Sequence, residues 1–194
     1  MIAVVDYDTG NLCSVANALS RLGAEFTVTA DSRQICSADR VLLPGVGEAF
    51  SAMERLREKG LDDVIKSLTI PVLGICVGMQ LMCHRSEEGS AECMGIFDCD
   101  VRRFRADENL KVPHMGWNSI EELSSRLFEG IEQGSYVYYI HSYAPDLCQH
   151  TIAKTEYGYK FSAALCRDNF FGTQFHPEKS GDMGEKILKN FLDL

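Results

Sequence analysis

The first half of the chain alternates short apolar runs with segments in which apolar residues recur at helical spacing. The runs at 2–7, 25–30, 40–45 and 70–75 predict buried strands. The intervening segments predict helices over 10–23, around Phe50, Met53 and Leu56, over 61–67, and from about Gly78. This alternation is typical of parallel strands joined by helical crossovers.

From about residue 95 the pattern changes to short alternating segments separated by turns. These segments lie at 97–104, 135–143, 151–157, 160–166 and 169–175. They predict strands in an antiparallel or mixed extension of the sheet. A last helix over 181–194 would pack Ile187, Leu188 and Phe191 onto the body. Because the length suits one core and no linker interrupts it, we expect a single α/β domain over residues 1–194 with a mostly parallel central sheet.

The composition excludes several classes of protein. The chain is 45% apolar and 24% charged, and its formal net charge of -9 without a basic cluster argues against a nucleic-acid-binding surface. The longest charge-free apolar stretch, 69–83, is broken by a proline and two glycines and is shorter than the roughly 20 residues of a membrane span. Asp6 and Asp8 stand where a signal peptide would be basic and then apolar. We therefore expect a cytoplasmic protein with neither nucleic acid nor membrane as a partner.

The cysteines indicate no disulfide or zinc framework. They are scattered without a C-x-x-C pair, at positions 13, 36, 76, 83, 93, 99, 148 and 166. A chain of this size needs no disulfide staples, and zinc sites need closer ligand spacing. We expect no metal site and no cofactor, and we interpret every thiol except that of Cys76 as a reduced packing residue.

Cys76 lies between Gly74 and Gly78, where a predicted strand gives way to a helical pattern. The pattern has the form of a nucleophile elbow with cysteine in place of serine. Glycine at both positions would remove side chains that collide with a nucleophile on a strained bend, and the following helix N-terminus would favour the thiolate. The alternative is a buried structural cysteine at a close contact between helix and strand.

A nucleophile needs a base and an orienting group, and segment 172–180 supplies both. His176 ends a strand-like run, and Glu178 lies two residues further on, on the same side of an extended backbone. Pro177 biases His176 toward that extended conformation. We expect Glu178 to bind one imidazole nitrogen while the other faces Cys76. The predicted oxyanion donors are the backbone N–H groups of Val77 and of Val46 or Gly47.

Several motifs carry a family resemblance. The segments "GICVGMQ" (74–80), "HPEKS" (176–180) and "PGVG" (44–47) resemble the class I (triad) glutamine amidotransferases. The segments "VPHMGWN" (112–118) and "YYIHSY" (138–143) look like one branch of that family, the glutaminase subunits of imidazole glycerol phosphate synthase. The resemblance extends from "YDTGN" near the N-terminus to the last helix, and it implies a flavodoxin-like three-layer sandwich with an antiparallel C-terminal extension.

The resemblance implies that Cys76 attacks the side-chain amide of glutamine, that His176 protonates the departing ammonia, and that Glu178 orients His176. It assigns glutamine binding to Gly47, Gln80, Glu88, Ser142 and Tyr143. It assigns the partner interface to Asn11, Trp117, Tyr138 and Lys179. The ammonia would pass to a cyclase subunit with a (β/α)8-barrel fold, which forms imidazole glycerol phosphate and AICAR in histidine biosynthesis. The isolated chain of this heterodimer would be a poor glutaminase.

Other functions use the same residues differently. A paralogous glutaminase subunit would feed a synthase of a surface-sugar or other pathway, and a stand-alone γ-glutamyl hydrolase would need no partner. A catalytically silent module on the same fold would use Cys76 as a redox sensor. The intact set of Cys76, His176 and Glu178 favours the glutaminase. His114 and His141 are interpreted as surface or core histidines whose hydrogen bonds are satisfied, and neither is assigned a metal or proton-transfer role.

Overall fold

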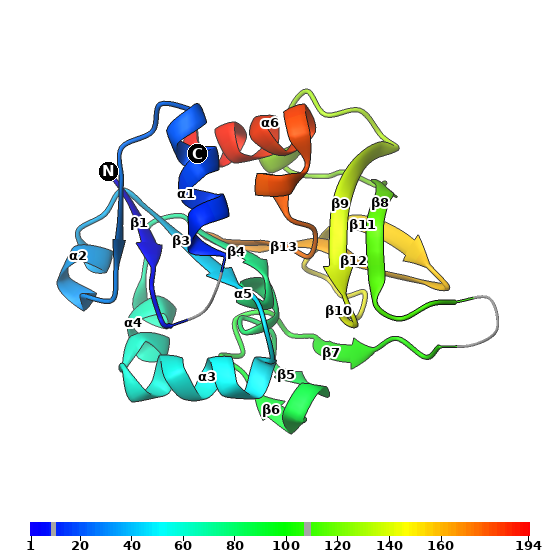
Figure 1. Cartoon of the computed structure of the whole chain (residues 1–194), viewed down its shortest axis with the longest axis horizontal. Coiled ribbons are helices and arrows are strands. Elements are labelled where there is room, and N and C mark those ends of the chain that lie inside the picture. Colours follow the sequence, from blue (N-terminus) through cyan, green and yellow to red (C-terminus); the bar gives the residue numbers. More distant parts are fainter. Residues whose placement is uncertain (9–10, 107–109) are drawn as a thin grey trace.

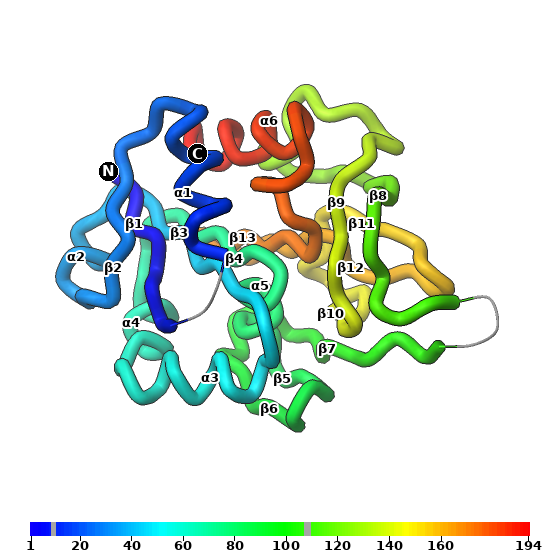
Figure 2. Tube along the Cα trace, in the orientation of Figure 1, coloured from blue at the N-terminus to red at the C-terminus, as the bar shows by residue number. Residues whose placement is uncertain are grey.

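The central sheet has the strand order β11-β12-β13-β4-β3-β1-β2 in the computed structural model, which describes residues 1–8, 11–106 and 110–194. Its parallel strands are β2 (Phe26–Thr29), β1 (Ile2–Val5), β3 (Arg40–Gly45), β4 (Val72–Cys76) and β13 (Phe170–Thr173). Its antiparallel strands are β12 (Tyr159–Arg167) and β11 (Thr151–Tyr157). β13 lies beside β4 although the two are far apart in the sequence (Figure 2). The prediction of a mostly parallel sheet with an antiparallel extension is confirmed.

Helices cover both faces of this sheet, which makes three layers (Figure 1). One face carries α1 (Leu12–Arg21) and α6 (Gly181–Leu192), and the other carries α3 (Ala49–Glu58) and α4 (Leu61–Ser67). A short helix, α2 (Ser32–Cys36), connects β2 and β3. Ile187, Leu188 and Phe191 of α6 are fully buried, as predicted, whereas Phe50 of α3 is exposed. Within the described residues, every helix is too short or too polar to cross a bilayer.

Two of the predicted strand segments do not extend the central sheet. Segment 97–104 contains β7 (Asp100–Arg103), which joins β10 (Tyr143–Pro145), β5 (Arg85–Ser86) and β6 (Ala91–Glu92) in a separate sheet. Segment 135–143 contains β9 (Ser135–His141), which pairs with β8 (His114–Ile120) in an antiparallel ribbon. The ribbon lies against the sheet because Tyr139 packs edge-to-face on Phe161 and Phe175. The prediction of one continuous sheet was therefore wrong for these two segments.

β4 ends at Cys76 in a strained backbone conformation. Its φ of 53° and ψ of -111° are rare for a residue other than glycine. A Cβ on Gly78 would lie 1.8 Å from the carbonyl oxygen of Leu43 in β3, and a Cβ on Gly74 would lie 2.7 Å from the backbone nitrogen of Met79. The bend thus requires both glycines, as the pattern predicts. The collisions they avoid, however, are with the neighbouring strand and the following turn, and not with the nucleophile itself.

The helix predicted to begin near Gly78 is present, but it is short. α5 covers only Val77–Gln80, a single turn. Few peptide dipoles add up over one turn, so the helix N-terminus makes a smaller contribution to the charge state of the site than a long helix would.

All eight cysteines have free thiols. Cys83 and Cys99 are buried, in agreement with a packing role. Cys13 and Cys36 are exposed on the helices α1 and α2, so their interpretation as packing residues was wrong. The helical spacing that places their neighbours in the core turns these two side chains toward solvent.

The close approach at Gly78 predicts a large loss of stability for Gly78→Ala. The new methyl group meets a backbone carbonyl that is fixed in the sheet, so we expect the free energy of unfolding in urea to fall by at least about 3 kcal/mol. Gly23→Ala is the control, because Gly23 has a φ of 68° but no atom within 4 Å of an added Cβ. That change should cost only about 1 kcal/mol of backbone strain. Equal losses for the two variants would contradict this account of the elbow.

Candidate active site

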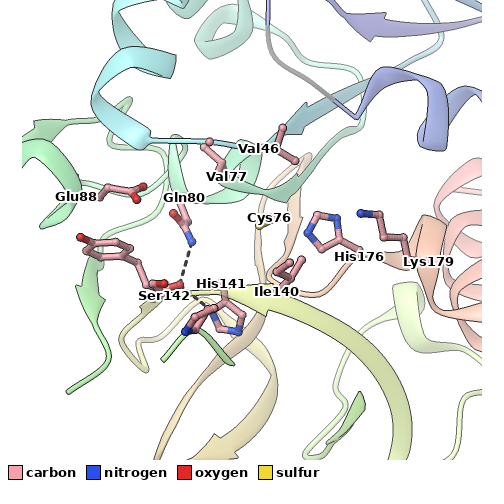
Figure 3. Close-up of a pocket in the computed structure, with 13 residues that line it drawn as sticks. Val46, Cys76, Val77, Gln80, Glu88, Ile140, His141, Ser142, His176 and Lys179 are labelled. Atoms are coloured by element: carbon pink, nitrogen blue, oxygen red, sulfur yellow. Dashed lines mark hydrogen bonds between the residues drawn. The ribbon is translucent and has the colours of Figure 1, made fainter. Parts of the chain in front are cut away.

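A cavity of about 380 Å³ opens where β3, β4 and β13 end (Figure 3). This is the edge of an open α/β sheet at which ligands bind. The predicted residues that line it are Val46, Gly47, Cys76, Val77, Gln80, Glu88, Ser142, Tyr143, His176 and Lys179. The fold therefore gathers into one cavity residues that lie far apart in the sequence.

His176 and Cys76 lie side by side in this cavity (Figure 3). His176 Nδ1 is 2.7 Å from Glu178 Oε1, and both side chains are buried. Since a carboxylate can only accept, His176 Nδ1 carries a proton and donates a hydrogen bond to Glu178. The other imidazole nitrogen is left for Cys76, whose sulfur interacts with the ring. The pairing of His176 with Glu178 is the predicted one, but the expectation of an extended backbone through Glu178 was wrong. His176 is extended, and Glu178 lies in the short 3-10 helix Pro177–Lys179 that follows it.

Neighbouring groups decide the protonation states of His176 and Glu178. Burial by itself lowers the pKa of His176, but the adjacent Cys76 sulfur and Glu178 carboxylate raise that pKa to about 10. Burial raises the pKa of Glu178, but the hydrogen bonds from His176 and Asn11 outweigh it and bring that pKa below its usual value. Near neutral pH the site therefore holds an imidazolium against a carboxylate, with a proton available to a leaving group.

Asn11 adds a third side chain to the His176–Glu178 pair. Its Nδ2 donates to Glu178 Oε1 at 2.6 Å. The resemblance places Asn11 on the partner face, and the hydrogen bond gives it a role inside the site that sequence reasoning missed. Asn11 belongs to the "YDTGN" segment, of which Thr9 and Gly10 lie outside the described residues.

The loop that carries His176 is tied to β9. The backbone N–H of His176 donates to the Tyr138 carbonyl at 2.9 Å, and the Tyr138 N–H donates to Ser180 Oγ at 2.9 Å. The Ser180 hydroxyl in turn donates to the His176 carbonyl at 2.7 Å. The position of the imidazole therefore depends on the β8–β9 ribbon as well as on β13.

Two glutamine side chains form a hydrogen-bonded pair that reaches Cys76. Gln174 Nε2 donates to Cys76 Sγ at 3.6 Å, and Gln174 Oε1 accepts from Gln80 Nε2 at 2.9 Å. Gln80 Oε1 is buried without a hydrogen-bond partner among the described residues. Sequence reasoning missed Gln174, although it lies two residues before His176, at the spacing that places side chains on one side of an extended strand.

Other predicted residues line the same cavity. Val46 and Gly47 follow β3 and line the cavity with Val77, and Gly47 has a φ of 94° with open space around it. Glu88 lines the same cavity and accepts from the Ala49 N–H at 2.9 Å. Burial raises the pKa of the Glu88 carboxyl, although this hydrogen bond opposes the shift.

The β8–β9 ribbon exposes a row of large apolar side chains. Met115 is 64% exposed and Trp117 is 54% exposed on β8, and Tyr136 and Ile140 are exposed on β9. Trp117 lies opposite Tyr138 in the ribbon, with the two rings in a T-shaped contact. Ile140 belongs both to this row and to the lining of the cavity, so the apolar face borders the site.

The fold is shared with solved glutamine amidotransferases. One crystal structure of a glutamine amidotransferase superposes with a TM-score of 0.76 and 17% identity over 100% of this chain and 98% of the other. The glutaminase domain of Trypanosoma brucei CTPS with bound acivicin has a TM-score of 0.67 and 16% identity, over 99% of this chain and 93% of the other. At these identities the likeness establishes the fold alone.

Sequence relatives are much closer. Imidazole glycerol phosphate synthase subunit HisH of Bacteroides thetaiotaomicron is 55% identical over 194 residues, which cover 100% of this chain and 99% of the relative. The subunit of the same name from Escherichia coli K12 is 48% identical over 195 residues, with the same coverage of both chains. The family model of class-I glutamine amidotransferases matches residues 3–194. Because that match spans nearly the whole chain, the protein belongs to the class-I glutamine amidotransferase family.

Proposed function

We propose that this protein is the glutaminase subunit of an imidazole glycerol phosphate synthase. It hydrolyses glutamine and delivers the ammonia to a cyclase subunit with a (β/α)8-barrel fold, which makes imidazole glycerol phosphate and AICAR in histidine biosynthesis. The observation that carries the proposal is the buried His176–Glu178 pair beside Cys76, in a chain 55% identical over its full length to a HisH subunit.

The reaction follows from the charges at the site. The Cys76 sulfur attacks the side-chain carbonyl carbon of glutamine, and the backbone N–H groups of Val77 and of the turn at 46–47 stabilise the negative oxygen. His176 gives its proton to the amide nitrogen, the C–N bond breaks, and ammonia leaves. Water then attacks the thioester carbon and gives a proton to His176, the C–S bond breaks, and glutamate and the free cysteine are released. Glu178 keeps the imidazole oriented through both steps.

Glutamine would be held by groups around the cavity. Gln80 Oε1 is an unused acceptor among the described residues. The Glu88 carboxylate lines the cavity and matches the α-ammonium group of an amino acid. Ser142 and Tyr143 line it as well, and their backbone N–H groups would bind the α-carboxylate. These contacts would leave the side-chain amide of glutamine directed toward Cys76.

The exposed row of the β8–β9 ribbon is proposed as the surface that docks the barrel. Apolar aromatic side chains are the usual anchors of protein interfaces, and this row borders the cavity through Ile140. Lys179 also lines the cavity. It belongs to the loop at 176–180, which is hydrogen-bonded to Tyr138 of β9. Ammonia released beside His176 would then pass to the partner without crossing bulk solvent.

Labelling with the glutamine-like electrophile diazo-oxo-norleucine tests the nucleophile. In the presence of the barrel partner and its ligand, we expect modification of Cys76 alone, measured by peptide mass spectrometry. Cys76→Ala should lose labelling and at least about 10³-fold of glutamine hydrolysis. No labelling of the assembled complex would favour the redox module, and full activity without a partner would favour a stand-alone γ-glutamyl hydrolase.

The pH dependence of hydrolysis tests the role of Glu178. The pKa of His176 is raised to about 10, so the imidazolium is present below that pH and is lost as the pH rises through it. Glu178→Gln removes one of the charges that raise this pKa, so the alkaline decline of kcat should move to lower pH and kcat itself should fall by about 100-fold or more. Glu54→Gln, an equal charge change on an exposed face of α3, should keep the original profile. An unshifted decline in Glu178→Gln would argue against the assigned pair.

Trp117→Ala tests the docking surface. Loss of a central aromatic anchor costs about 2 kcal/mol, so we expect the Kd for the barrel partner to rise about 30-fold in a calorimetric titration. Val28→Ala is the control, since Val28 is also exposed but lies on β2 at the far edge of the central sheet. Wild-type affinity in the Trp117 variant would remove the ribbon from the interface.

A further inference from the structure

Two buried histidines lie next to the glutamine-binding turn. His114 Nδ1 and His141 Nε2 are 3.0 Å apart, and both residues are buried. The His114 ring is stacked between Tyr139, at 4.7 Å, and Tyr157, at 3.9 Å between ring centroids. Burial lowers the pKa of His114 to about 4 and that of His141 to about 3, so both imidazoles are neutral near pH 7. Neutral rings have one donor and one acceptor nitrogen each.

Their partners determine which nitrogen carries each proton. His141 Nδ1 is 2.8 Å from the carbonyl oxygen of Tyr143, which can only accept, so this nitrogen carries the proton of His141. His141 Nε2 is then an acceptor, and it accepts a hydrogen bond from the protonated Nδ1 of His114. His114 Nε2 accepts in turn from Asn118 Nδ2 at 3.3 Å. Every nitrogen of the two rings is satisfied by a single arrangement of protons.

The same carbonyl connects the histidines to the nucleophile. Tyr143 O also accepts from Gln80 Nε2 at 3.0 Å, and Gln80 Nε2 donates its second proton to Gln174 Oε1 at 2.9 Å. Gln174 Nε2 then directs an N–H at Cys76 Sγ. A continuous hydrogen-bond network, partly buried at Asn118 and Tyr143 and buried at the other side chains, therefore runs from Asn118 to Cys76 through His114, His141, Tyr143, Gln80 and Gln174.

We propose that His114, His141 and Gln174 are positioning residues for the hydrolysis of glutamine. The two histidines hold the turn at Tyr143, where the substrate carboxylate would bind, and Gln174 holds the sulfur that attacks the amide. This inference rests on the proposed glutaminase function. The hydrogen-bond network begins at Asn118, next to the exposed Trp117 on β8. A partner that docks on the ribbon would therefore contact the strand on which this network begins.

A packing role alone does not account for this arrangement. Two imidazoles in the core lose hydration that an apolar pair of similar volume would not lose. A fully satisfied polar network does specify one geometry, which an apolar pair would not. The network found here fixes the positions of the turn at Tyr143 and of the Cys76 sulfur.

A matched pair of His141 variants tests the histidine end in the complex with the barrel partner and its ligand. His141→Asn retains a donor near the position of Nδ1 and should keep the KM for glutamine within about threefold of wild type. His141→Leu removes that donor and should raise KM by about tenfold, the factor that corresponds to one buried hydrogen bond, with kcat much less affected.

A KM in His141→Leu equal to wild type, or an equal rise in both variants, would overturn this part of the proposal. If His141→Leu does not fold, His141→Asn decides alone, because a tenfold rise in its KM contradicts the proposal and a wild-type KM supports it. Thermal unfolding identifies which variants are folded.

Alkylation of Cys76 tests the other end of the hydrogen-bond network, and it does not require glutamine turnover. Gln174→Glu keeps the shape of the side chain and the acceptor for Gln80 but replaces the N–H that faces the sulfur with a negatively charged oxygen. The pH at which iodoacetamide modifies Cys76 at half its maximal rate should rise by about one unit or more, measured on the Cys76 peptide. Gln149→Glu, an equal charge change at an exposed position, should leave that pH unchanged.

An unshifted alkylation profile in Gln174→Glu would overturn the role of Gln174. Failure of the glutaminase proposal has a different signature, since the wild-type complex would then neither hydrolyse glutamine nor react with diazo-oxo-norleucine. The alkylation profiles of the two variants would still differ if Gln174 positions the sulfur.

Discussion

The whole site depends on the contact between the Gly78 backbone and the Leu43 carbonyl. That contact leaves no room for a Cβ and brings the turn after β4 directly over β3. It holds Cys76 at a φ of 53° at the carboxyl end of the sheet, where its side chain reaches the cavity. A conformation of this kind costs on the order of 1–3 kcal/mol, and it persists because strands buried on both faces hold the two segments in place. Packing alone therefore fixes the position of the Cys76 side chain, without any contribution from charge.

Charge then distinguishes histidines that are equally buried. His176 lies between the Cys76 sulfur and the Glu178 carboxylate, and their combined effect exceeds that of burial, so its pKa rises. His114 and His141 face each other and a backbone carbonyl, so burial dominates and their pKa values fall. One imidazole thus keeps a proton that it can transfer, while the other two stay neutral and act through fixed hydrogen bonds.

The rigid sheet and the β8–β9 ribbon divide the functions of the molecule between them. Strand β4 of the sheet ends at Cys76, and the loop after β13 carries His176. The ribbon leads into the turn at Ser142 and Tyr143 and carries the exposed apolar row. The two parts meet in the backbone hydrogen bonds that join His176, Tyr138 and Ser180, and again in the hydrogen bonds that reach Cys76 through Gln174. Hydrogen bonds therefore connect the ribbon to both His176 and Cys76.

Local patterns in the sequence were sufficient for the parallel sheet, the elbow at Cys76 and the pairing of His176 with Glu178. Each of these depends on spacing over a few residues: the alternation of strands and helices, glycine on both sides of a cysteine, and a carboxylate two residues after a histidine. The single turn of α5, the separate ribbon and the roles of Asn11 and Gln174 were decided only by the tertiary structure. Asn11 contacts Glu178 at a separation of 167 residues, and Gln174 contacts Cys76 at a separation of 98. Contacts at such separations depend on how the buried faces pack, and local spacing in the sequence does not encode that packing.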